Sequence, residues 1–114
     1  MNKVSIVLPT KDRHKHLFKC LGSLKEQGKE FKEVVIIDSS SDSKSKKTVD
    51  KFKNYLNIKY IYQEPAGYSP AYNLGIKKAR GKWIAFLNDD CIVSKNWAEQ
   101  LNKALEKHPA DIIQ

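Results

Sequence analysis

Four short segments rich in β-branched and aromatic residues recur along the chain, and this recurrence limits the fold more than any other feature. They are VSIVLP (4–9), EVVIID (33–38), IKYIYQ (58–63) and KWIAFLN (82–88). Segments of this length and composition are typical of buried strands. The stretches between them are long enough for the crossover connections that parallel strands require. The pattern therefore predicts an α/β fold, with a Rossmann-like parallel sheet and helices on both faces.

The stretches outside these segments carry helix signals. Apolar residues recur at helical spacing in three of them: Leu17, Cys20, Leu21 and Leu24; Val49, Phe52 and Leu56; Trp97, Leu101, Ala104 and Leu105. A further helix is predicted to begin with Ser69 as its N-cap and Pro70 at its first position, and to end at Gly81. Ser94 is the predicted cap of the last helix, and ADIIQ (110–114) resembles the beginning of another strand.

Composition and charge set the range of partners. A chain of 114 residues forms one domain, and its formal net charge of +8 favours an anionic partner such as a nucleotide, a nucleic acid or a membrane surface. Cys20 and Cys91 lack the spacing of a metal site or a disulfide framework, so both are expected to pack. No apolar stretch reaches the ~18–20 residues of a membrane span or resembles a signal peptide. We expect a cytoplasmic protein, with peripheral membrane association as a further expectation.

A carboxylate follows every predicted strand. The four strand ends read Thr10-Lys11-Asp12, Asp38-Ser39-Ser40, Gln63-Glu64 and Asn88-Asp89-Asp90. The carboxyl ends of parallel strands lie at one edge of a sheet, where ligands bind. Several carboxylates at one edge repel each other, and a divalent cation relieves that repulsion. Oxygen ligands favour magnesium or manganese.

Two common phosphate-binding motifs are missing from the sequence. No GxGxxG follows the first predicted strand, and no GxxxxGK[ST] occurs anywhere in the chain. These absences exclude a dinucleotide fold of the dehydrogenase kind and a P-loop. A metal bound by Asp90, or the amides at the helix start near Ser69, could hold a phosphate instead.

Three motifs together carry a resemblance to a known family. VSIVLPTKDR, EVVIIDSSSD and AGYSPAYNLGIKKARGKWIAFLNDDC occur in this order. They resemble the amino-terminal half of the family 2 inverting glycosyltransferases, which have the GT-A fold. The resemblance implies transfer of a sugar, with inversion, from a nucleotide-diphosphate donor. It favours a UDP-sugar and a magnesium or manganese cofactor.

The resemblance also implies roles for individual residues. It places five residues against the nucleotide, namely Thr10, Asp12, Asp38, Asn73 and Asp89, and it assigns the metal to Asp90. Within this set Asp38 would contact the base and Asp89 the ribose. Each of the carboxylates has a structural alternative. Asp12 could cap the following helix, Asp38 could accept hydrogen bonds from turn amides, and Asp89 and Asp90 could belong to a solvated turn.

The sequence departs from the family pattern at three positions. Ser39 and Asn88 stand where many relatives carry aspartate, and Tyr72 stands where many carry arginine. Ser39 leaves the identity of the base open, whereas the amide oxygen of Asn88 can still accept a hydrogen bond or bind a metal. The tyrosine removes a cation that would lie near the diphosphate.

The resemblance extends over nearly the whole sequence and bears on how much of the domain the sequence contains. It covers essentially all of residues 1–114, which we therefore expect to form the amino-terminal, donor-binding part of a GT-A domain. The acceptor half and its general base would lie outside this truncated segment, so the catalytic base is unknown. We expect the chain alone to be inactive, and its exposed sheet edge to favour self-association as a homo-oligomer.

Two functions of other classes remain as alternatives. A receiver-like signalling domain binds magnesium at a similar sheet edge, but it needs an acidic pair after the first strand, where this chain has Thr10-Lys11-Asp12. A nucleic-acid-binding module would explain the positive charge, but it should show a basic stripe with interleaved aromatic residues. SKSKK (43–47) is the nearest approach to one, so we expect no nucleic-acid partner.

Overall fold

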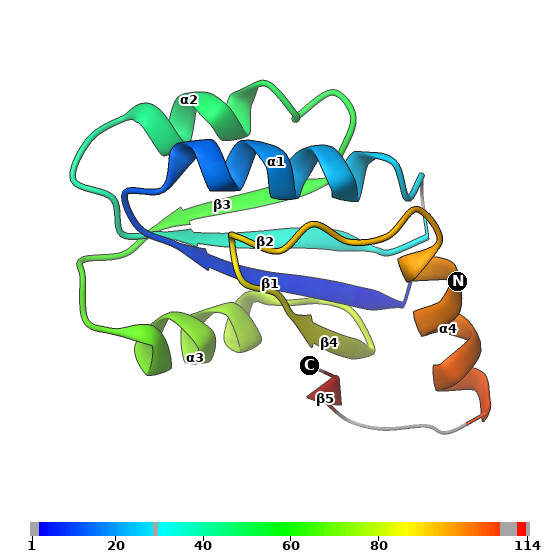
Figure 1. Ribbon diagram of the computed structural model, residues 1–114. Coiled ribbons are helices and arrows are strands. Elements are labelled where there is room, and N and C mark those ends of the chain that lie inside the picture. The colour runs from blue at the N-terminus through cyan, green and yellow to red at the C-terminus, as the bar shows by residue number, and fades with distance from the viewer. Residues whose placement is uncertain (1–2, 29, 108–111, 114) are drawn as a thin grey trace.

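The computed structural model describes residues 3–28, 30–107 and 112–113. Its centre is a parallel sheet of five strands in the order β3-β2-β1-β4-β5 (Figure 1). The strands are β1 (Val4–Thr10), β2 (Glu33–Asp38), β3 (Ile58–Tyr62), β4 (Trp83–Phe86) and β5 (Ile112–Ile113). The predicted parallel sheet is confirmed. Of the strand expected at 110–114, residues 110, 111 and 114 lie outside the described residues.

Helices cover both faces of this sheet, as the sequence predicts. They are α1 (His14–Lys25), α2 (Lys44–Asp50), α3 (Tyr68–Lys78) and α4 (Trp97–Lys107). Figure 1 shows α1 and α2 on one face and α3 on the other. None of the helices in the described part of the chain has the length and apolar character needed to cross a membrane.

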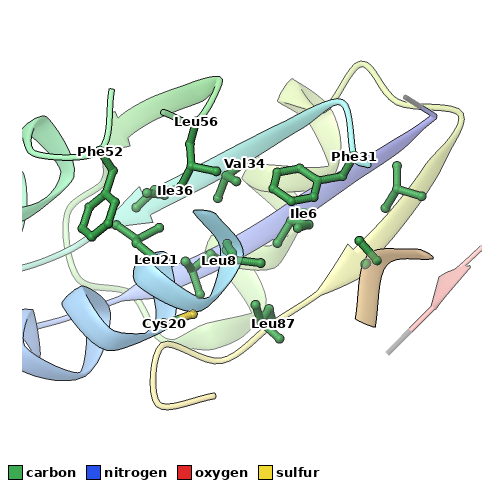
Figure 2. Close-up of a cluster of buried hydrophobic side chains, with 14 of the residues drawn as sticks. Ile6, Leu8, Cys20, Leu21, Phe31, Val34, Ile36, Phe52, Leu56 and Leu87 are labelled. Atoms are coloured by element: carbon green, nitrogen blue, oxygen red, sulfur yellow. The ribbon is translucent and has the colours of Figure 1, made fainter. Parts of the chain in front are cut away.

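The larger core lies between the sheet and helices α1, α2 and α4. Side chains of β1 alternate between the two faces, so that Ile6 and Leu8 join this core while Val7 joins a smaller one beneath α3. The four predicted core residues of α1 are fully buried: Leu17, Cys20, Leu21 and Leu24. Figure 2 shows Cys20 and Leu21 beside Leu8. Burial raises the pKa of the Cys20 thiol to about 12, which fits the predicted packing role.

Several helix boundaries differ from the prediction. The second helix ends at Asp50, yet Phe52 and Leu56 still enter the core because hydrogen-bonded turns continue past the helix. The third helix is capped by Gly67 rather than Ser69. Gly67 has a φ of 91°, a left-handed conformation that glycine adopts without strain.

Gly81 does not end a helix, because α3 stops at Lys78. Instead it packs against the amino end of β1. A Cβ atom at this position would lie 2.6 Å from the Ser5 nitrogen, and the Gly81 N–H donates to Ser5 Oγ at 2.7 Å. The structure therefore needs glycine here for a close approach of two backbones.

The last helix also begins later than predicted. It starts at Trp97, and Ser94 instead accepts the Trp97 N–H through its backbone carbonyl. The Ala98 N–H, in the first turn of α4, donates to Gln27 Oε1 at 2.9 Å. A buried side chain just beyond α1 thus satisfies one of the unpaired amides of α4.

A buried carboxylate holds together the sheet edge formed by the amino ends of the strands. Glu33 accepts a hydrogen bond from Ser5 Oγ at 2.6 Å and another from the Arg80 N–H at 2.6 Å, and it pairs with Lys59 at 3.5 Å. Burial alone would raise the pKa of Glu33. These donors and the lysine charge outweigh it and hold that pKa below its ordinary value.

We predict that Glu33→Gln lowers the free energy of unfolding at pH 7 by about 1–3 kcal/mol, because a buried, hydrogen-bonded charge is lost. A carboxylate with a lowered pKa in the folded state stabilises the protein above its unfolded-state pKa, and this contribution disappears as the pH falls through the folded-state pKa. Urea unfolding of both proteins between pH 3 and pH 7 should therefore show a difference that shrinks toward acid. A difference independent of pH would contradict the prediction.

Candidate functional site

The strand order reverses beside β1, which makes the carboxyl end of this strand the expected binding position. From β1 the chain moves outward to β2 and β3, then returns to place β4 on the other side of β1. Ligands of open parallel sheets bind at such a reversal. The segment after β4 approaches the end of β1 there, and Thr10 Oγ1 donates to Asp89 Oδ2 at 2.8 Å. Both residues are buried.

Two adjoining cavities open at this edge. The first, which we call the inner cavity, has a volume of about 250 Å³ and is lined by Pro9, Thr10, Lys11, Arg13, Ile37, Ser39, Pro65, Ala66, Gly67, Tyr68, Ala71 and Asp89. The second, which we call the acidic cavity, has a volume of about 380 Å³ and is lined by Pro9, Arg13, Tyr68, Tyr72, Asn88, Asp89 and Asp90. The two share four residues, so a ligand of nucleotide size can extend from one into the other.

Arg13 lies against the acidic pair. Its Nε is 3.4 Å from Asp89 Oδ1, and its Nη2 is 3.5 Å from Asp90 Oδ2. The Asp89 side chain is 8% exposed and also accepts the Thr10 hydroxyl, whereas the Asp90 side chain is 51% exposed. Asp90 is thus the more accessible of the two carboxylates.

Tyr72 closes the other side of the acidic cavity. Its hydroxyl donates to Asn88 Oδ1 at 3.2 Å, and its ring packs edge-on against Phe86. Burial, followed by the nearby groups Tyr68 and Asp89, raises the pKa of Tyr72, so it is a neutral hydrogen-bond donor at physiological pH. Tyr72 thus supplies a neutral hydroxyl at a position where the family resemblance implies a positive charge.

The donor atoms fit a metal ion whose coordination is completed by a phosphate ligand. Within residues 3–28, 30–107 and 112–113, no cluster of three His, Cys, Asp or Glu side chains could hold a metal alone. Magnesium, however, is usually bound through one or two carboxylates together with substrate phosphates. The accessible carboxylate of Asp90, next to Asp89, has the chemistry that such a site needs.

Asp38 reaches the same edge, but its carboxylate points into the larger core. It is 1% exposed, with Oδ1 accepting the Ser40 N–H at 2.9 Å and Oδ2 accepting the Tyr60 hydroxyl at 2.5 Å. The structural alternative from the sequence, a bond to a turn amide, is therefore present. The next residue, Ser39, lines the inner cavity instead. Contact between Asp38 and a base stays a prediction.

Asp12 joins two loops of the site edge. Its carboxylate accepts the Ser41 N–H at 2.8 Å and the Ser41 hydroxyl at 2.9 Å, and its own N–H donates to Ser40 Oγ at 2.8 Å. These bonds from Ser41 hold the pKa of Asp12 below its ordinary value. Its φ of 54° is left-handed, a conformation that aspartate tolerates better than most residues. The helix cap is Arg13, so Asp12 does not cap α1.

The structure does not bring Asn73 to the cavities. On α3, Ala71 and Gly75 pack against the sheet, while Tyr68 and Tyr72 line the acidic cavity. Asn73 is two positions from Ala71, about 200° around the helix, and is exposed. Its assignment to the nucleotide stays a prediction that this geometry does not support.

Sequence reasoning missed Arg13 and Tyr68. Arg13 directly follows the predicted Asp12, and Tyr68 is four residues before Tyr72, so it lies one helical turn away on the same face. Helical spacing could have found the tyrosine. No local signal indicates that Arg13 points toward residues 89 and 90.

Comparison with known proteins gives concordant matches. The sequence model of the family described as Glycosyl transferase family 2 matches residues 5–114. The poly(ribitol-phosphate) beta-N-acetylglucosaminyltransferase TarS of Staphylococcus aureus is 29% identical over 99% of this chain and 20% of its own length. The crystal structure of TarS 1–349 in complex with UDP-GlcNAc has a TM-score of 0.85 and 28% identity, covering 93% of this chain and 32% of that one.

A more distant match concerns the fold alone. The mannosyltransferase PcManGT from Pyrobaculum calidifontis, in complex with GDP-Man and Mn²⁺, has a TM-score of 0.80 at 21% identity. It covers 95% of this chain and 32% of that chain. This chain therefore spans a fifth of the length of TarS and about a third of the chains in these two structures.

We predict that Tyr60→Phe lowers the free energy of unfolding by about 1.5–3 kcal/mol, because it leaves Oδ2 of the buried Asp38 without its donor. Tyr55→Phe is the matched control, since it removes a hydroxyl from a ring that is 60% exposed. Urea denaturation at pH 7 measures both. Equal stability of the two variants would show that the Tyr60–Asp38 bond contributes nothing.

Proposed function

This chain belongs to glycosyl transferase family 2, and we therefore propose that it is the part of a glycosyltransferase that binds the nucleotide-diphosphate sugar donor. The observation that carries the proposal is the acidic pair at the strand-order reversal: Asp89 lines both cavities, and Asp90 lines the acidic cavity. A uridine nucleotide is favoured, because the related TarS has been crystallised with UDP and with UDP-GlcNAc.

The two cavities suggest how a donor would lie. The inner cavity combines apolar side chains, among them Ile37 and Ala71, with the hydroxyl of Ser39, a lining suited to a base and its sugar. The acidic cavity would receive the diphosphate. Thr10 fixes the orientation of Asp89 from the end of β1, so the carboxylate is held in place before a ligand arrives.

A magnesium or manganese ion would be held by Asp90, with Asp89 beside it. When bound, the ion would supply positive charge to the leaving diphosphate. The protein's own part is to hold the acidic pair at the cavity junction. Tyr72 contributes its hydrogen bond to Asn88, which fixes the residue before the pair.

Transfer with inversion needs one further group. The acceptor hydroxyl attacks the sugar carbon as the bond to the diphosphate breaks, and a general base takes the hydroxyl proton. Both carboxylates that line the cavities, Asp89 and Asp90, serve the donor in this proposal. The base and the acceptor site are therefore assigned to no described residue.

Calorimetric titration with UDP tests the proposed function. In the presence of Mn²⁺ we expect saturable binding to the purified chain, and in EDTA we expect clearly weaker binding. GDP and ADP at the same concentrations serve as controls for base preference. If the folded chain bound no nucleoside diphosphate with Mn²⁺ present, the proposed function would be refuted.

We predict that Asp90→Ala removes the Mn²⁺-dependent part of UDP binding and leaves the melting temperature within about 2 °C, because the side chain is half-exposed. Asp50→Ala is the matched control. Its side chain is 47% exposed, pairs with Lys46 and Lys53, and lines neither the inner nor the acidic cavity. Manganese dependence that survives in Asp90→Ala would show that Asp90 does not bind the ion.

A further inference from the structure

The acidic cavity of the proposed donor site is lined by two carboxylates, Asp89 and Asp90, and by the neutral Tyr72. A diphosphate would bring negative charge next to Asp89 and Asp90, and a divalent ion offsets only part of the total. Tyr72 cannot supply a charge, and its hydroxyl already donates to Asn88. Another side chain at the cavity junction must therefore meet the diphosphate if the donor is to bind well.

Arg13 is the cation whose position fits this need. It lines both the inner cavity and the acidic cavity, whereas Lys11 lines the inner cavity alone. A ligand with its base in one cavity and its phosphates in the other would pass the guanidinium at the junction. Arginine also binds phosphate oxygens through two parallel hydrogen bonds, a geometry that lysine lacks.

The guanidinium is only loosely engaged by the acidic pair. Its two contacts, at 3.4 and 3.5 Å, are longer than the ~2.7–2.9 Å of strong charge-assisted hydrogen bonds. Within the described residues its side chain makes no hydrogen bond that meets ordinary distance and angle limits. The side chain is 40% exposed, so it can move without disturbing the core. A guanidinium with five N–H donors thus retains most of its capacity for a ligand.

We infer that Arg13 is a donor-binding residue with two alternating partners: the Asp89-Asp90 pair in the free protein and the diphosphate in the donor complex. This inference rests on the proposed function. A divalent ion at the acidic pair would replace the positive charge that Arg13 supplies there. Its repulsion would favour movement of the guanidinium toward the phosphate oxygens. The metal ion and Arg13 would thus compete for the two carboxylates, whereas both would favour binding of the nucleotide.

Three variants test the inference. Arg13→Ala removes the charge, and Arg13→Lys keeps the charge but loses the planar fork. Arg80→Ala is the matched control, because Arg80 is exposed and holds Glu33 through its backbone N–H, which the variant retains. Thermal melting establishes that each variant is folded. UDP and uridine are titrated by NMR with EDTA present, and Mn²⁺ is titrated alone by calorimetry.

Direct contact with the diphosphate has a signature that a structural role would not produce. In EDTA, Arg13→Ala should bind UDP about 10- to 100-fold more weakly than the unaltered chain, with uridine affinity unchanged. Arg13→Lys should be intermediate, and Arg80→Ala should match the unaltered chain. Mn²⁺ alone should bind Arg13→Ala at least as tightly as the unaltered chain, because the competing cation is gone.

Other results would refute either the role of Arg13 alone or the proposed function as well. If the unaltered chain binds UDP and Arg13→Ala binds it equally well in EDTA, the role of Arg13 is refuted and the proposed function stands. If Arg13→Ala loses Mn²⁺ binding, Arg13 supports the acidic pair rather than competing for it, and the inference is also refuted. If the unaltered chain binds no UDP under any condition, the proposed function fails and this inference fails with it.

Discussion

The buried hydrogen bond from Thr10 to Asp89 holds the candidate site together, because it joins two strands where their backbone pairing has stopped. Strand β1 remains paired with β2 as far as Thr10, but its register with β4 ends at Val7 and Phe86. Beyond that point the end of β1 and the segment after β4 are no longer paired as strands, and both cavities open there. One side-chain hydrogen bond of 2.8 Å spans the gap. Strand β4 thus ends at Phe86, while β1 continues to Thr10 and lines the inner cavity.

Much of the fold could be predicted because its determinants are local. Short, nearly continuous apolar runs specify the strands, and helical spacing specifies the buried face of α1. The helix ends were predicted less well, because their determinants come from distant parts of the chain. Gly81 is glycine because β1 approaches it, and the first turn of α4 is satisfied by Gln27, a residue beyond α1. Neither contact can be inferred from the sequence of a single helix.

The candidate site was predictable in position but not in the direction of each side chain. Parallel topology brings the acidic strand ends to one edge, and Asp89 and Asp90 line a cavity there. The inward direction of Asp38 could have been inferred, since residues 36 and 38 of a strand share one face. Its partner Tyr60 could not, because it lies on a different strand. The approach of Arg13 to the acidic pair likewise depends on how the loop after β1 folds.

Asp38 and Ser39 are neighbours in the chain, yet one faces the protein interior and the other faces the inner cavity. Substitutions at the two positions therefore have different consequences. Exchange of the buried carboxylate would break its hydrogen bonds to Ser40 and Tyr60 in the interior, whereas exchange of Ser39 would change only the lining of the inner cavity. A family built on this strand end can diversify what it recognises one residue at a time, without first acquiring a compensating change in its core.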